Sequence, residues 1–153
     1  MKKPTWFAKR YPSVGDLEKS AWELNAVVVR GPIDSSCIVY SPDPEEVTVI
    51  CLPQDLGPLE EVWQLAHEVG HLVLHQGYSS PWACGRHEAA AERWAAQALV
   101  PESAVRRHRN ASVDAFIGAL SAHYEDLPME DCPQRRLAAK IATIRLRAVE
   151  EVA

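Results

Sequence analysis

The chain has 153 residues, of which 47% are hydrophobic, and its formal net charge is −5. This length suits one domain with a modest core, and the acidic balance argues against a protein that binds nucleic acid through an overall basic charge. We expect a single domain over residues 1–153, made of successive parts at residues 1–55, 56–101 and 102–153.

The N-terminus is basic, but no apolar run follows it, so neither a signal peptide nor a membrane span is expected. The four cysteines are scattered without paired spacing, which favours reduced thiols over a disulfide framework. These features predict a cytoplasmic protein that does not associate with a membrane.

The first part of the chain predicts one short helix and a small sheet. The helix is expected from Asp16 to Asn25, because its apolar residues fall on one side. Three β-rich runs follow, separated by turn residues, at residues 26–29, 37–40 and 47–51. We expect an α+β fold in which this small antiparallel sheet packs beside the next helix and a helical C-terminal half follows.

The next helix is expected to begin near Pro58, because proline suits an early helical position. Apolar residues then recur at three- and four-residue steps as far as Val73, and Gln76-Gly77 is the expected stop. One face of this helix should therefore be buried.

That helix contains the sequence His67-Glu68-Val69-Gly70-His71. Residues four positions apart share a helix face, so His67 and His71 can bind one metal ion while Glu68 leans toward a metal-bound water. The pattern is typical of zinc hydrolases in which the glutamate is the general base. The alternative is a pair of core histidines satisfied by hydrogen bonds.

A catalytic zinc ion usually has three protein ligands and one open position, so a third ligand is needed. An alanine-rich helix is expected over residues 86–100, ended by Pro101. On it Glu88 and Glu92 lie one turn apart, so one carboxylate can bind the metal and the other can hydrogen-bond a ligand histidine. The alternative for both is a solvated surface charge.

Other residues are weaker candidates for the same site. His75 is an auxiliary candidate only, because a third histidine normally needs a longer, glycine-containing turn after the motif. His87 could replace Glu88 as a ligand, and a Cys84 thiolate that bound zinc would make the site structural or latent. An oxyanion donor is also expected, and the candidates that sequence does not rank are Tyr78, His75, His123 and Tyr124.

These motifs resemble the ImmA/IrrE-like metallopeptidases, which carry the gluzincin type of HExxH site. The similarity lies in residues 66–75, in Glu88, and in the segment 94–101 that ends in proline, and it spans roughly residues 47–101. Glu92 stands where the family usually has Asn or Asp, and Ala90 stands where a further acidic residue is common.

The resemblance implies one zinc ion per chain, bound by His67, His71 and Glu88, and it favours Glu88 over Glu92 as the third ligand. Glu92 is then expected to contact a ligand histidine. The resemblance also implies a narrow protein substrate, such as a helix-turn-helix repressor or an antitoxin-like transcription factor of a mobile element or stress response.

Beyond Pro101 the sequence predicts helices over residues 113–124 and 135–145, joined by Leu127-Pro128-Met129, which could form a helix-turn-helix. Arginines concentrate in this half. A solvated basic face is favoured over DNA binding because the chain as a whole is acidic, so specific nucleic-acid binding is not expected.

Together these features predict a zinc-dependent endopeptidase with Glu68 as the general base. The alternative is a DNA-binding or scaffold regulator with a structural zinc site. The sequence indicates neither the oligomeric state nor the activating signal.

Overall fold

The computed structural model describes residues 3–41, 43, 45–74, 85–108, 110 and 112–150. Within these residues the chain has an α+β fold. The strands are β1 (Ala26–Gly31), β2 (Cys37–Val39) and β3 (Thr48–Pro53). The helices are α1 (Val14–Glu23), α2 (Pro58–Leu74), α3 (Gly85–Leu99), α4 (Glu102–Arg107), α5 (Val113–His123) and α6 (Pro133–Glu150).

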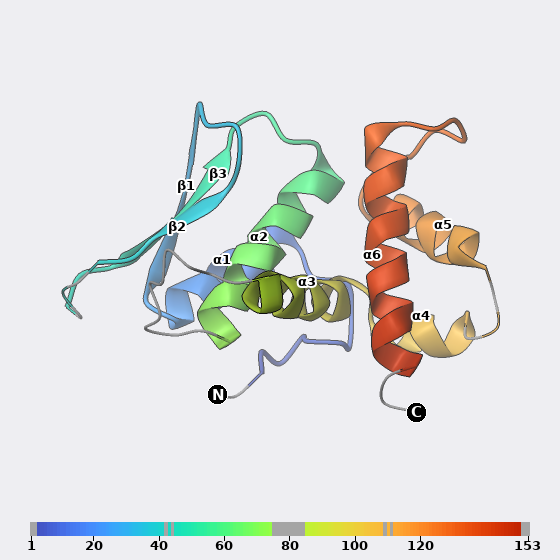
Figure 1. Ribbon diagram of the computed structural model, residues 1–153, viewed down its shortest axis with the longest axis horizontal. Helices are drawn as coiled ribbons and strands as arrows, with labels where there is room; N and C mark the ends of the chain where they lie inside the picture. The colour runs from blue at the N-terminus through green and yellow to red at the C-terminus, as the bar shows by residue number, and fades with distance from the viewer. Residues whose placement is uncertain are drawn as a thin grey trace.

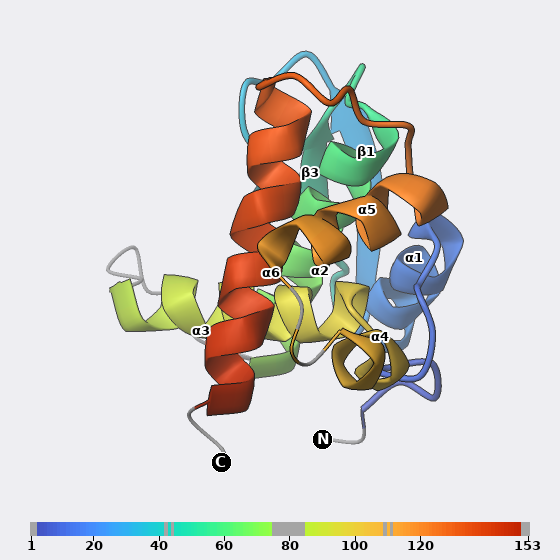
Figure 2. The same cartoon turned by 90° about the vertical axis from the view of Figure 1, so that its right-hand side faces the viewer.

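The helix α2 lies between the sheet and the C-terminal helices. In Figure 1 the three strands lie on the left, α2 and α3 cross in the middle, and α4, α5 and α6 form the right-hand side. Figure 2, turned by a quarter, places α4, α5 and α6 in front and the strands behind them. No helix in the described ranges is long and apolar enough to span a membrane.

The sheet is mixed, so the expectation of an antiparallel sheet is wrong. Its order is β1-β3-β2, with β1 parallel to β3 and β2 antiparallel to β3. The central strand β3 is the most buried of the three, with Ile50 and Leu52 fully enclosed. A strand with buried apolar residues is best shielded from solvent in the centre of a sheet. This explains why β3 lies between β1 and β2, which follow each other in the sequence.

The start of α1 differs from the prediction by two residues. Ser13 caps the helix: its Oγ accepts a hydrogen bond from the Asp16 amide at 3.1 Å, and the Asp16 carboxylate accepts one from the Ser13 amide at 2.8 Å. Asp16 is thus the third helical residue of a capping box. The helix ends at Glu23, and Asn25 takes up a left-handed conformation at φ 59° before β1.

The helix α2 begins at Pro58, as predicted. The amide of Leu59 donates a hydrogen bond to the Glu125 carboxylate at 3.1 Å, so a residue beyond α5 satisfies a free amide at the helix start. On the sheet side, Arg30 of β1 pairs with Glu61 of α2 at 2.6 Å and with Glu18 of α1 at 2.7 Å. These contacts hold α2 between the sheet and the C-terminal half.

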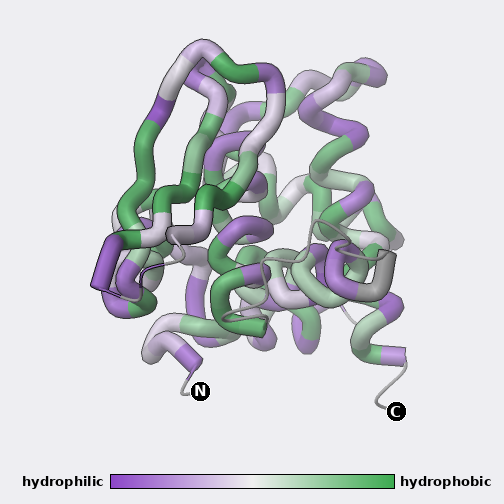
Figure 3. Tube along the Cα trace, turned by 60° about the vertical axis from the view of Figure 1, so that its left-hand side comes forward, coloured by the Kyte–Doolittle hydropathy of each residue, from purple (hydrophilic) through white to green (hydrophobic). Residues whose placement is uncertain are grey.

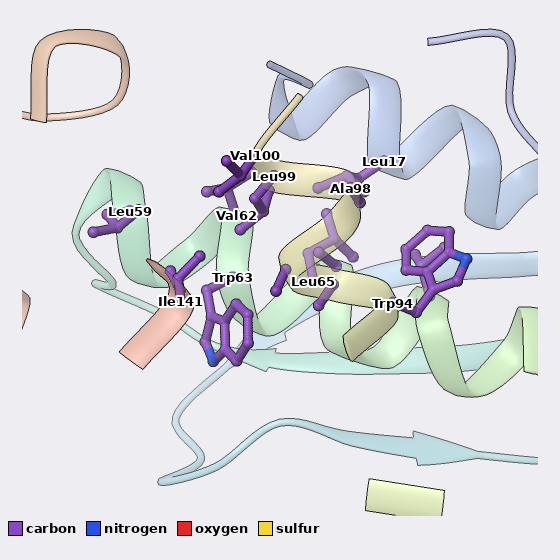
Figure 4. Close-up of a cluster of buried hydrophobic side chains, with 14 of the residues drawn as sticks. Leu17, Leu59, Val62, Trp63, Leu65, Trp94, Ala98, Leu99, Val100 and Ile141 are labelled. Atoms are coloured by element: carbon purple, nitrogen blue, oxygen red, sulfur yellow. The ribbon is translucent and has the colours of Figure 1, made fainter. Parts of the chain in front are cut away.

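The main hydrophobic core surrounds α2. Figure 4 shows side chains from α2 and α3 packed together, with Leu17 of α1 and Ile141 of α6 at the edges of the cluster. The sequence pattern predicted the buried face of α2 correctly, since Val62, Leu65 and Val69 are all buried. The predicted helix end at Gln76-Gly77 lies outside the described residues.

The C-terminal helices lie close to their predicted positions, but α6 is longer than expected and runs from Pro133 to Glu150. Residues 124–132 connect α5 to α6, a longer link than the three- or four-residue turn of a helix-turn-helix. Arg145 is buried, and its guanidinium donates hydrogen bonds to the Val100 carbonyl and the Glu102 carboxylate, each at 3.1 Å. This arginine therefore joins α6 to the α3–α4 junction and is not a surface charge.

Candidate metal centre

Two helices bring the three predicted ligands together. His67 and His71 lie one turn apart on α2, and Glu88 lies in the first turn of α3. The Glu88 carboxylate oxygens lie 3.1 Å from His67 Nε2 and 3.0 Å from His71 Nε2. The two imidazole Nε2 atoms are 3.1 Å apart, and their rings are nearly perpendicular.

The chemistry of this donor set fits a zinc ion. One ligand atom from each of the three residues can be chosen so that all lie within 4.8 Å of one another. Two imidazole nitrogens and a carboxylate are ligands that zinc prefers, and three protein ligands leave one position open. Both histidines are largely shielded from solvent, with 16% and 13% of their side chains exposed, whereas Glu88 is 53% exposed. The open side of the site therefore lies toward Glu88.

Gly70 allows α2 and α3 to approach closely enough to form this cluster. A Cβ atom at position 70 would lie 3.1 Å from the Ala91 carbonyl oxygen and 3.3 Å from Cε3 of Trp94. These distances are shorter than an ordinary van der Waals contact, so a larger residue would push α3 away. Since Ala91 follows Glu88 by one turn, the spacing of the two helices sets the position of the third ligand.

The Glu68 side chain lies on the buried side of α2. Only 6% of the residue is exposed, and Ser36 Oγ donates a hydrogen bond to its carboxylate at 2.6 Å. Burial raises the pKa of Glu68, and the hydrogen bond from Ser36 and the nearby His67 oppose this increase. A buried carboxylate that a hydrogen bond holds beside the candidate metal centre is placed to accept and return a proton.

Glu92 contacts a lysine of α6. Its carboxylate pairs with Lys140 Nζ of α6 at 2.6 Å, and the same ammonium lies 5.7 Å from the ring centre of Trp63. Trp63 belongs to α2, and its ring centre is 6.4 Å from that of His67. Lys140 thus connects α6 to both helices that carry the predicted ligands. A direct role of Glu92 in orienting a histidine remains a prediction.

The structure describes only some of the remaining candidate site residues. His75, Tyr78 and Cys84 lie outside the described residues. His87 is described and lies on α3, but it is not one of the three residues that form the candidate metal cluster.

The other two oxyanion candidates lie near the opposite end of α2. The Tyr124 hydroxyl donates a hydrogen bond to the Pro12 carbonyl at 3.0 Å, and the His123 ring stacks on Tyr11 with ring centres 4.4 Å apart. Both line a cavity of about 330 Å³ with Pro58 and Val62, residues from the first turns of α2. The structure therefore does not bring them to the cluster near the end of that helix.

Ser36, Gly70 and Lys140 were not predicted to contribute to the site. Gly70 carries a sequence signal, because a glycine inside an apolar helix is costly and often indicates close packing. Ser36 and Lys140 carry no such sequence signal, because only the packing of distant parts of the chain brings them close to Glu68 and Glu92.

The three-residue cluster, with Glu68 beside it, has the ligand chemistry expected of a zinc metallopeptidase. Comparison with protein families matches residues 22–125 to the IrrE N-terminal-like domain. The match covers more than half of the chain, and the chain belongs to this family of metallopeptidases. Comparison with curated proteins and with solved structures gave no match.

Proposed function

We propose that the protein is a zinc-dependent endopeptidase that cuts a repressor or an antitoxin-like regulatory protein. The observation that supports the catalytic part most strongly is the convergence of His67, His71 and Glu88 beside the buried Glu68. The regulatory substrate is proposed from the resemblance to ImmA/IrrE-like peptidases. Family membership supports the metallopeptidase class.

In this proposal, His67, His71 and Glu88 hold the metal. A bound zinc ion would polarise the scissile carbonyl and lower the pKa of a water molecule. Glu68 takes a proton from that water at its carboxylate and later passes the proton to the leaving amine. The hydrogen bond from Ser36 holds the Glu68 carboxylate in one orientation and leaves its second oxygen for the proton.

We propose that the edge strand β2 binds the substrate. The strand order β1-β3-β2 leaves one side of β2 without a partner strand within the described sheet. Ser36, which contacts Glu68, immediately precedes this strand. An extended peptide that pairs with β2 would therefore lie near the proposed general base, and backbone hydrogen bonds would hold it there.

The test is cleavage of a candidate repressor, chosen as the product of the neighbouring gene, by the wild-type protein and by Glu68→Gln. Glutamine keeps the shape of the side chain but cannot accept the proton, so cleavage should fall by about 10²–10⁴-fold while the zinc content stays the same. Ser13→Ala, which removes a helix cap on α1 away from the cluster, is a control that should retain cleavage. Equal cleavage by zinc-loaded Glu68→Gln would exclude Glu68 as the base.

A further inference from the structure

Cys37 and Cys51 lie directly opposite each other in the sheet. Cys37 on β2 and Cys51 on β3 are register partners in the antiparallel pair. Partners in such a pair have Cα atoms about 4.5–5.5 Å apart, and their side chains lie on the same face. This spacing falls within the range of about 4.4–6.8 Å that a disulfide requires. Both cysteines are free thiols in the structure.

The pair lies on the face of the sheet that points away from α2. Ile38 and Ile50, the next register partners along, face the core, so the alternating residues Cys37 and Cys51 face outward. Cys37 is exposed and Cys51 is half-buried. Figure 3, turned so that the sheet side comes forward, shows hydrophobic residues along much of the strands. On this outer face Val29, the β1 partner of Cys51, is 46% exposed, so solvent reaches the thiols.

The cysteine pair lies next to the contact between Ser36 and Glu68 beside the candidate metal centre. Cys37 directly follows Ser36, whose hydroxyl group donates a hydrogen bond to Glu68. A covalent bond between Cys37 and Cys51 would fasten the short edge strand β2 to the central strand β3. It would do so one residue away from the contact with Glu68.

We propose that Cys37 and Cys51 form a redox-active dithiol site, which peroxides oxidise to a reversible intramolecular disulfide. The site is separate from the metal centre and does not depend on the proposed peptidase activity. It is a consequence of the sheet register, which the spacing of the cysteines in the sequence did not reveal.

The chemistry proceeds in two steps. The Cys37 thiolate attacks one oxygen of hydrogen peroxide, which gives a sulfenic acid and hydroxide. The Cys51 thiol then displaces the sulfenic hydroxyl group, and water leaves as the sulfur–sulfur bond forms. In total, two thiols and one peroxide give one disulfide and two waters. Desolvation, together with the neighbouring Cys51 and Glu68, raises the pKa of the Cys37 thiol, so oxidation should be faster at pH 9 than at pH 7.

The experiment treats the full chain with hydrogen peroxide, then counts free thiols under denaturing conditions and maps cross-linked peptides by mass spectrometry. The chain has four cysteines, so the expected thiol count falls from four to two and returns to four with dithiothreitol. The mapped cross-link should join Cys37 to Cys51. Cys37→Ser and Cys51→Ser should each abolish it.

Cys84→Ser and Cys132→Ser are the matched controls, and each should still form the cross-link and lose two thiols. The proposal is overturned if the wild-type protein keeps four thiols, or if the cross-link involves Cys84 or Cys132. It is also overturned if oxidation only joins separate chains. The readout is a disulfide bond and not peptide cleavage. Failure of the dithiol proposal would therefore leave the peptidase proposal untouched, and failure of the peptidase proposal would leave the dithiol proposal untouched.

Discussion

Replacement of Gly70 by alanine tests whether the close approach of α2 and α3 builds the metal centre. Inside a helix, alanine is favoured over glycine by about 1 kcal/mol. At position 70, however, the new Cβ would lie 3.1 Å from the Ala91 carbonyl oxygen and 3.3 Å from the Trp94 ring. The first of these neighbours is backbone, which yields only if α3 shifts. Overpacking of this kind costs about 1–3 kcal/mol.

The net effect of Gly70→Ala should therefore be a loss of about 0–2 kcal/mol in the free energy of unfolding. Gly118→Ala is the matched control, because Gly118 lies within α5 and a Cβ atom added there would meet no other described residue within 4 Å. That variant should gain about 0.5–1 kcal/mol. The two variants should differ by about 0.5–3 kcal/mol in denaturant unfolding of metal-free protein.

Zinc affinity provides a second readout for the same pair of variants. A shift of α3 moves Glu88 relative to His67 and His71, so Gly70→Ala should weaken zinc binding by about tenfold, which is the lower end of typical losses from supporting residues. Gly118→Ala should leave it unchanged. If both variants gain stability equally and bind zinc as the wild type does, then close helix packing does not position the third ligand.

Three further predictions concern individual side chains and the arginine-rich C-terminal half. Glu88→Ala should remove a metal ligand, whereas Glu92→Ala should weaken zinc affinity only about 10- to 100-fold in competitive titrations; the reverse order would exchange their roles. The ion pair with Arg10 lowers the pKa of Asp16 well below its usual range. The ionised carboxylate therefore stabilises the folded state at pH values above the unfolded-state pKa of about 3.9. This stabilisation is lost as the pH falls toward the pKa of Asp16 in the folded state. Asp16→Asn should therefore cost about 1 kcal/mol at neutral pH, with the difference from the wild type shrinking in unfolding curves below about pH 4. Duplex DNA should bind weakly and without sequence preference in fluorescence anisotropy, with affinity falling steeply with salt; tight selective binding at physiological salt would favour the regulator alternative.

The helices that carry the site could be predicted from local signals. The spacing of apolar residues defined the buried face of α2, and Pro101 marked the end of α3, because both signals act within a few residues. The same periodicity placed His67 and His71 on one face, and the structure places them together.

The pairing of strands and the supporting contacts of the site could not be predicted in the same way. The sheet was expected to be antiparallel, but β3 lies between β1 and β2 and runs parallel to β1, because its buried residues need cover on both sides. The contact between Ser36 and Glu68, and the pairing of Lys140 with Glu92, join residues far apart in the chain. No local pattern encodes such contacts, which depend on how whole elements pack.

The central claim is that His67, His71 and Glu88 hold one zinc ion, and native mass spectrometry of the purified protein tests it most directly. We predict about one zinc ion per chain in the wild-type protein and almost none in the double variant His67→Ala/His71→Ala. His123→Ala, at a histidine that stacks on Tyr11 away from the cluster, should retain the metal. A folded double variant that still carried one zinc ion per chain would contradict the account.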